Sequence, residues 1–223
     1  MADGTGRRGV LFDVDGTLID TNYLHVVAWW QAFRERGYDD VRMADIHHAV
    51  GKGSGKLIEQ LLGKPDPSVS EAHSRYYAPY LGRLRPFPRA ARLLRATAEL
   101  GLAVVLASSV KTDEVDLLLG TLQAGDVIDT VVSSSDAERT KPEPDLLQVG
   151  IERGELDPGG CVMVGDTAWD VEAAAKAGVP CIAVLTGGWS AEHLRDAGAV
   201  AVYDDAAALL AELKESPIGQ LAR

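Results

Sequence analysis

The stretch Gly9-Val10-Leu11-Phe12-Asp13-Val14-Asp15-Gly16-Thr17-Leu18-Ile19-Asp20 is the most informative part of this chain. An apolar strand leads directly into two carboxylates and a glycine turn. Residues two apart in a strand point to the same side, so Asp13 and Asp15 begin on one side of the chain. Two close carboxylates repel each other unless a cation or a shared proton relieves them. Because Mg²⁺ prefers oxygen ligands, the stretch predicts a magnesium site at the end of a buried strand.

Other polar side chains follow later apolar runs in the same way. These residues are Ser108, Lys141, Asp166 and Asp170. Each lies at or just beyond the carboxyl end of a predicted strand, and in an open α/β sheet that edge is where ligands bind. We therefore expect the four residues to meet the first carboxylate pair at one site.

The second half of the chain alternates apolar strands with amphipathic helices. We predict strands at 9–14, 102–107, 130–132, 161–164, 181–185 and 200–203. We predict helices near 112–121, 143–153, 168–177, 191–197 and 205–214. Such alternation predicts an α/β fold, a Rossmann-like parallel sheet with helices on both faces.

Residues 20–85 interrupt this alternation, because they hold helical patterns and no convincing strand. The helices are expected near 22–36, 42–50, 55–63 and 69–83. We therefore divide the chain into an α/β core domain, 1–19 and 86–223, and a small all-helical domain, 20–85. The hinges between the two are expected near Thr17–Thr21 and Arg85–Pro88, where prolines interrupt the chain.

Composition narrows the class of protein. Acidic residues outnumber basic ones 33 to 22, for a formal net charge of −11, which disfavours nucleic acid and anionic membranes as partners. The chain has 2 cysteines, Cys161 and Cys181, both in apolar runs, which predicts buried thiols in a reducing compartment. The N-terminus has no apolar targeting segment. We expect a cytoplasmic protein, a monomer or a weak homodimer.

The order of these motifs resembles that of the haloacid dehalogenase-like superfamily. The matching residues are Asp13-Val14-Asp15-Gly16-Thr17, then Ser108, then Lys141, then Gly165-Asp166 with Asp170. The resemblance extends from Val10 to the last predicted helix, near Leu213. It implies that the helical domain, 20–85, is a mobile cap that closes over the site and carries much of the substrate specificity.

The resemblance also implies the roles of the two carboxylates in the first motif. Asp13 would be the nucleophile that forms an aspartyl-phosphate intermediate. Asp15 would be the general acid and base, which protonates the leaving oxygen and then activates water. An aspartate at the second position fits the phosphatases and mutases of the superfamily, whereas the transport ATPases carry threonine there.

The phosphoryl group and the metal would be held by the remaining motif residues. The phosphate-binding residues implied are Ser108, Ser109, Lys141, Gly16 and Thr17. Ser108 is favoured over Ser109 because it directly follows the apolar run, although a slip of one residue exchanges them. The Mg²⁺ ligands implied are Asp13, the main-chain carbonyl of Asp15, and Asp166. Asp170 is either a further ligand or an acceptor for Lys141 or a metal-bound water.

Three residues of the helical domain are candidates for substrate contact. The loop Gly51-Lys52-Gly53-Ser54-Gly55-Lys56 is not a phosphate loop, since its glycines are misspaced and no strand precedes it. Lys52 or Lys56 could nevertheless contact the substrate from the cap. His25 lies close to the nucleophile in sequence and is a third candidate. The other histidines, His73 among them, are interpreted as ordinary residues.

The motifs together indicate a Mg²⁺-dependent phosphatase of a small phosphorylated metabolite, similar to phosphoglycolate phosphatases. A sugar-phosphate mutase resembling beta-phosphoglucomutase is the nearest alternative. It would return the phosphoryl group to a bound intermediate rather than to water, and its fourth motif usually has paired acids where this chain has Gly165-Asp166. A non-catalytic binding domain on the same fold is a distant alternative, because a degenerate copy should have lost catalytic carboxylates.

Overall fold

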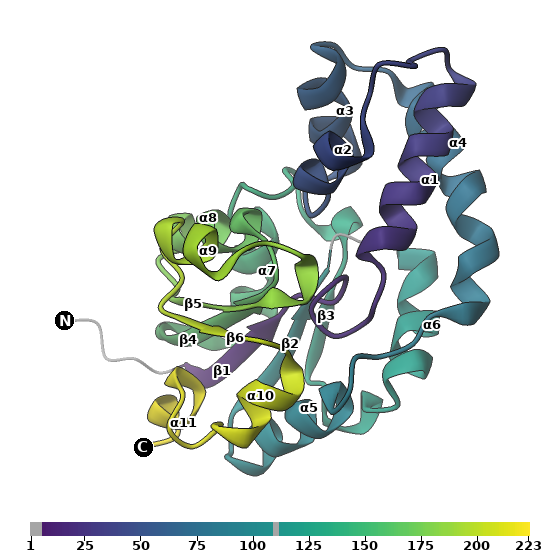
Figure 1. Cartoon of the computed structure of the whole chain (residues 1–223). Coiled ribbons are helices and arrows are strands. Elements are labelled where there is room, and N and C mark those ends of the chain that lie inside the picture. Colours follow the sequence, from purple (N-terminus) through teal and green to yellow (C-terminus); the bar gives the residue numbers. More distant parts are fainter. Residues whose placement is uncertain (1–5, 109–111) are drawn as a thin grey trace.

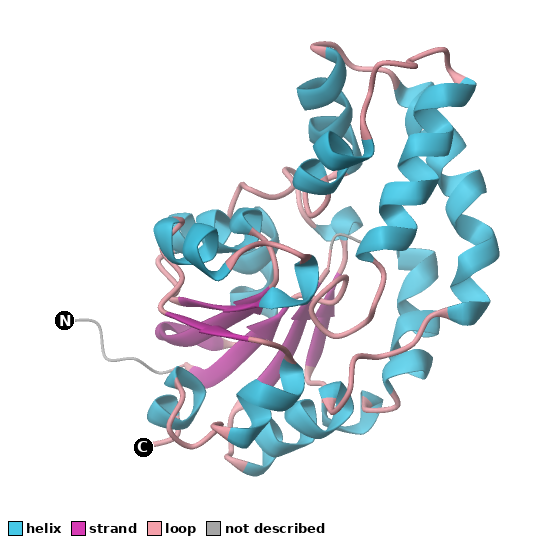
Figure 2. Ribbon diagram, viewed as in Figure 1, coloured by secondary structure: helices cyan, strands magenta, loops and turns pink. Residues whose placement is uncertain are grey.

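The computed structural model describes residues 6–108 and 112–223. A six-stranded sheet with the order β3-β2-β1-β4-β5-β6 forms its centre, and every neighbouring pair of strands is parallel (Figure 2). The strands are β1 (Arg7–Phe12), β2 (Ala103–Ala107), β3 (Thr130–Val132), β4 (Leu156–Gly165), β5 (Cys181–Val184) and β6 (Ala201–Tyr203). The predicted α/β class is confirmed.

Helices cover both faces of this sheet. They are α5 (Ala90–Glu99), α6 (Thr112–Leu122), α7 (Asp145–Arg153), α8 (Ala168–Ala177), α9 (Ala191–Asp196), α10 (Ala206–Ala211) and α11 (Pro217–Leu221). Alternate residues of β1 point to opposite faces. Val10 and Phe12 pack with α5, α6, α10 and α11, whereas Leu11 packs with α7, α8 and α9. Burial on both faces explains why the strands are continuous apolar runs.

The remaining helices form a separate helical lobe beside the sheet (Figure 1). They are α1 (Asn22–Glu35), α2 (Met43–Ala49), α3 (Ser54–Leu62) and α4 (Pro67–Tyr77). The lobe has its own apolar core, in which Phe33, Ile46 and Leu57 are buried. The lobe therefore has a hydrophobic core of its own, apart from the clusters on the two faces of the sheet.

Two chain segments join the sheet to the helical lobe, and they run side by side. The amide of Asp20 donates to the carbonyl of Arg85 at 3.0 Å, and the amide of Phe87 donates to the carbonyl of Leu18 at 2.9 Å. These are the segments where the sequence predicted hinges. Their pairing ties the start of the lobe to its end.

The structure adds helix α5, over Ala90–Glu99, which the sequence analysis did not predict, and it differs most from the other predictions at the ends of three elements. Strand β4 begins at Leu156, which pairs with Arg7, although Pro158-Gly159-Gly160 is typical of a turn. Helix α4 ends at Tyr77 and a 3₁₀ segment follows, because Pro79 lacks the amide that an α-helix needs. The predicted helix 205–214 is shorter, and α11 follows it. Within the described ranges, no helix is long and apolar enough to cross a membrane.

Candidate active site

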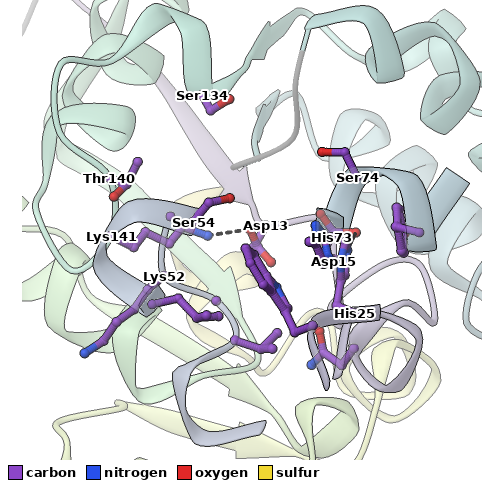
Figure 3. A pocket seen from close by; sticks show the side chains of 17 residues that line it. Asp13, Asp15, His25, Lys52, Ser54, His73, Ser74, Ser134, Thr140 and Lys141 are labelled. Carbon is purple, nitrogen blue, oxygen red and sulfur yellow. Dashed lines mark hydrogen bonds and ion pairs between the residues drawn. The ribbon is translucent and has the colours of Figure 1, made fainter. Parts of the chain in front are cut away.

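Charged side chains from β1 and from the loop before α7 meet at the carboxyl edge of the sheet (Figure 3). Asp13 directly follows β1, and its amide donates to the carbonyl of Val164 on β4 at 2.9 Å. Lys141 donates from Nζ to Asp13 Oδ1 and lies 2.7 Å from Asp170 Oδ1. The lysine side chain is 2% exposed. A buried ammonium therefore bridges two buried carboxylates.

Asp166, which follows β4, is held from two sides. The hydroxyl of Thr17 donates to its Oδ1 at 2.8 Å, and the amide of Asn22 donates to its Oδ2 at 2.7 Å. A β-carbon on Gly16, whose φ is +77°, would collide with Asn22 and Asp166. Glycine therefore lets the turn pass close beside the carboxylate.

Asp170 lies in the first turn of α8 and caps that helix. Its Oδ2 accepts from the amide and the hydroxyl of Thr167, at 3.0 and 2.6 Å, while Oδ1 faces Lys141. This capping box satisfies amides at the helix start. Asp170 thus anchors Lys141 and the start of α8 at the same time.

The site carries more negative charge than Lys141 balances. Burial raises the pKa of Asp13 to about 7, although Lys141 opposes the shift. Burial and the neighbouring carboxylates also raise the pKa of Asp166 well above its usual value. Burial alone would lower the pKa of Lys141, but Asp13 and Asp170 raise it above its ordinary value. Such a cluster is stabilised by an additional cation.

The donor atoms present fit a divalent metal ion. Asp13, Asp166 and Asp170 each offer one carboxylate oxygen, and these atoms lie within 4.8 Å of one another. An all-oxygen set is the chemistry that Mg²⁺ prefers. The structure therefore brings together the carboxylates of Asp13, Asp166 and Asp170, all of which the sequence analysis named as candidate metal ligands.

Asp15 lies across the turn from Asp13 and contacts the helical lobe instead of the carboxylate cluster. The hydroxyl of Thr21 donates to its Oδ1 at 2.8 Å, and His25 Nε2 lies 3.6 Å from the same oxygen. Burial raises its pKa, but the contacts with His25 and Thr21 outweigh burial and keep the pKa below its usual value. These contacts tie Asp15 to the start of the helical lobe.

The predicted serine position is only partly described. Ser108 is buried at the carboxyl end of β2, and its amide donates to the carbonyl of Val132 at 3.0 Å. The alternative, Ser109, lies outside the described residues. Ser108 therefore reaches the predicted edge of the sheet.

A cavity of about 300 Å³ opens on Asp13, Asp15 and Lys141, and residues of the helical lobe form part of its wall (Figure 3). The lobe residues that line it include Asn22, His25, Trp29, Lys52, Ser54, Leu57, His73, Ser74 and Tyr77. Ser134 and Thr140 line it from the sheet side. The volume suits a small molecule.

The two lysines proposed to contact the substrate are placed differently. Lys52 lines the cavity, but its ammonium points away from Asp13 (Figure 3), donates to Gln60 at 2.6 Å and lies 3.6 Å from the centre of the Trp169 ring. Lys56 is instead part of a half-exposed ion pair, 3.4 Å from Glu143. In this conformation neither ammonium faces the nucleophile.

Several contacts hold the helical lobe against the sheet. His47 Nε2 lies 2.7 Å from the carbonyl oxygen of Gly187, and Trp169 Nε1 donates to the carbonyl of His48 at 3.0 Å. The loop that carries Gly53 also lies against Thr140. In this structure α2 and the loop before α3 thus touch α8 and the loops after β3 and β5.

Asn22 and His73 are two of the residues that help build the site and that sequence reasoning missed. Asn22 was counted only as the start of a helix, although it donates to Asp166. His73 was interpreted as ordinary, yet it is 9% exposed, lines the cavity and contacts His25. The signal available for Asn22 was its place just after the first motif. For His73 no local signal exists, since its partner is 48 residues away.

Comparisons with known proteins agree with this geometry. The family described as haloacid dehalogenase-like hydrolase matches residues 10–184. A phosphoglycolate phosphatase from Rhodospirillum rubrum is 29% identical over 91% of this chain and 89% of its own length. The plasmid protein CbbY from Cupriavidus necator is 30% identical over 80% of this chain and 78% of its own. The crystal structure of a hydrolase from Pseudomonas syringae, 29% identical, superposes with a TM-score of 0.87 over 94% of this chain and 99% of that one.

Proposed function

Because the chain belongs to the haloacid dehalogenase-like hydrolase family, we propose that it is a Mg²⁺-dependent phosphatase of a small phosphorylated metabolite. The observation that carries the proposal is the cavity over the sheet edge, where Asp13, Asp15 and Lys141 all face the same space. Phosphoglycolate is the first substrate to test, since the relative from Rhodospirillum rubrum bears that name. The two buried free cysteines support a reducing compartment such as the cytoplasm.

Asp13 is the proposed nucleophile. One of its carboxylate oxygens attacks phosphorus while the bond from phosphorus to the ester oxygen breaks, and the bonding electron pair stays on the departing oxygen. Asp15 delivers a proton to that oxygen, which leaves as an alcohol. The product on the protein is an aspartyl-phosphate at Asp13.

Water then completes the reaction. Asp15, now ionised, takes a proton from a water molecule whose oxygen attacks the same phosphorus. The bond from phosphorus to Asp13 breaks, inorganic phosphate leaves, and the carboxylate of Asp13 is restored. Asp15 again holds the proton needed for the next turnover.

Lys141 and the metal site would neutralise the phosphoryl oxygens. Asp13, Asp166 and the main-chain carbonyl of Asp15 are the proposed Mg²⁺ ligands, and the bound ion would supply positive charge beside the transferring group. The contact between Asp170 and Lys141 supports a positioning role for Asp170 rather than direct ligation. Ser108 and Lys141 are proposed to hold the phosphoryl group, with Gly16 and Thr17 shaping the loop beside it.

The helical lobe, 20–85, is proposed to be a cap domain on the core formed by 1–19 and 86–223. Its separate apolar core and its paired connecting segments support this division. The contacts of α2 and α3 with the sheet lobe support closure over the bound substrate. Closure would exclude water that is not positioned by Asp15.

The decisive experiment measures phosphate release from phosphorylated metabolites, with phosphoglycolate and beta-glucose 1-phosphate included. Release that requires both Mg²⁺ and Asp13, lost on chelation and in Asp13→Asn, supports the phosphatase. Asp20→Asn is the matched control, because Asp20 is exposed on the same loop. Formation of glucose 6-phosphate without free phosphate would overturn the proposal in favour of a mutase. Full activity of Asp13→Asn would overturn the mechanism.

A further inference from the structure

Two histidines from different helices lie in series behind Asp15. His25 on α1 places Nε2 3.6 Å from Asp15 Oδ1, and its Nδ1 lies 3.2 Å from Nε2 of His73 on α4. His25 Nε2 faces a carboxylate oxygen, so we assign the ring proton of His25 to Nε2. With the proton on Nε2, Nδ1 is an acceptor, and His73 donates to it from Nε2.

Aromatic rings hold both histidines in place. The ring of His73 stacks on Trp29, with 3.9 Å between centroids and 17° between planes. The ring of His25 stacks on Tyr77, with 4.0 Å between centroids and 13° between planes. Trp29 and Tyr77 are each 4% exposed. Such stacking restricts rotation of the imidazoles, so the direction of each ring nitrogen is set by packing.

The contacts on Asp15 fall on one of its two oxygens. Thr21 and His25 both face Oδ1, and Asp15 also lines the cavity. A carboxylate held through one oxygen presents the other in a defined direction. Proton transfer to a leaving group needs that direction, because it works only within hydrogen-bond reach.

We propose that His73 is a positioning residue that acts through His25 to orient the carboxylate of Asp15 for proton transfer. The inference rests on the proposed function, in which Asp15 protonates the leaving oxygen. The helical lobe thereby contributes to the chemical step as well as covering the substrate. If His73 served only for packing, its removal would lower kcat by the same factor for all substrates. If it positions Asp15, its removal should lower kcat more for substrates whose leaving group needs a proton.

Two substrates of nearly equal size separate these roles. 4-Nitrophenyl phosphate releases a nitrophenolate that needs no proton, and phenyl phosphate releases a poorer leaving group that benefits from one. We expect His73→Leu to lower kcat about tenfold for phenyl phosphate and less than about threefold for 4-nitrophenyl phosphate. The larger loss is a fraction of the rate enhancement that general acid catalysis supplies. The measurement is steady-state kinetics of the full chain with Mg²⁺.

Two further variants keep the test independent of folding. His73→Gln retains an N–H donor near the place of Nε2, so we expect kcat for phenyl phosphate to return to within about threefold of wild type. His73→Asn is too short to reach His25 and should behave like His73→Leu. Trp29→Phe loosens the stacking without removing a donor, and it should lower both kcat values by a similar factor.

The outcomes distinguish the inference from the function on which it rests. Equal losses on both substrates, or equal activity of the Gln and Asn variants, would overturn the role of His73 while leaving a working phosphatase. A wild-type protein that releases no phosphate from any compound would overturn the proposed function, and the inference with it. Selective loss on phenyl phosphate, restored by glutamine, supports both.

Discussion

The carboxyl edge of the sheet and the helical lobe face one cavity with opposite chemistry. The edge presents buried charges, with Lys141 between Asp13 and Asp170. The lobe presents stacked rings and hydroxyls, with His73 and Trp29 prominent among them. The charges sit where strands and a helix begin or end, so the backbone sets their positions. The rings are positioned by the packing of helices against one another. The side chains of the lobe can therefore change without altering the charged edge of the sheet.

Removal of the buried ammonium should have the largest effect. Lys141→Met leaves the buried carboxylates of Asp13 and Asp170 without their cation, so we expect the free energy of unfolding to fall by about 3–5 kcal/mol. Activity should fall on the order of 10²–10³-fold, as for the loss of an electrostatic donor. Urea denaturation in the absence of Mg²⁺ and phosphate release measure the two effects.

The matched control is Lys176→Met. Lys176 also contacts two carboxylates, Glu172 at 3.0 Å and Glu143 at 3.2 Å, but its side chain is 38% exposed. Its loss should cost less than about 1 kcal/mol. An equal fall in the free energy of unfolding for the two variants would show that burial of the charges at the sheet edge does not strengthen their contribution to stability.

Mg²⁺ should stabilise the folded protein through the same carboxylates. Binding to the folded state alone, at a hundred times the dissociation constant, adds about 2.7 kcal/mol, or about 5–10 °C in Tm for a chain of this size. Differential scanning fluorimetry with and without EDTA measures the shift. Asp166→Asn should abolish it, and the exposed variant Asp20→Asn should keep it. Retention of the shift in Asp166→Asn would place the ion elsewhere.

The contact between the two regions should have a smaller effect. Trp169→Phe removes the N–H that donates to the carbonyl of His48, a bond worth about 0.5–1.5 kcal/mol. The closed arrangement should become less populated, so we expect KM to rise about 3–10-fold with little change in Tm. Trp30→Phe is the control, since that indole packs within the helical lobe. Equal KM values in the two variants would contradict a role for Trp169 in closure.

The smallest expected effect concerns Lys52, in the loop before α3, and is compared with that of Lys56 in α3. Lys52→Ala should raise KM for metabolite phosphates about 2–5-fold and leave KM for 4-nitrophenyl phosphate nearly unchanged, because a lysine that lines the cavity can select the organic part of the substrate. Lys56→Ala is the control and should change neither KM, since its half-exposed ion pair with Glu143 contributes little. Equal effects of Lys52→Ala on both substrates would reject a role in selectivity.

The sheet and its charged edge could be predicted from the sequence because their signals are local. An apolar run followed at once by Asp13, Ser108 or Asp166 indicates both the strand and the place where its polar residue lies. The rule that ligands bind at the carboxyl ends of parallel strands then brings these residues together without any knowledge of packing. Strand ends were predicted less well, as the early start of β4 at Leu156 shows.

By itself, the sequence determined the α/β class, the helical insertion and the set of buried charges, since each depends on periodicity or on a residue beside a strand end. Only the tertiary structure decided that Asn22 supports Asp166, that the ammonium of Lys52 rests on Trp169, and that His73 lies behind His25. These contacts join residues far apart in the chain, and they depend on how helices pack and where the lobe closes. Short-range sequence patterns do not specify such contacts, because the same amphipathic helix can pack against its neighbours in many ways.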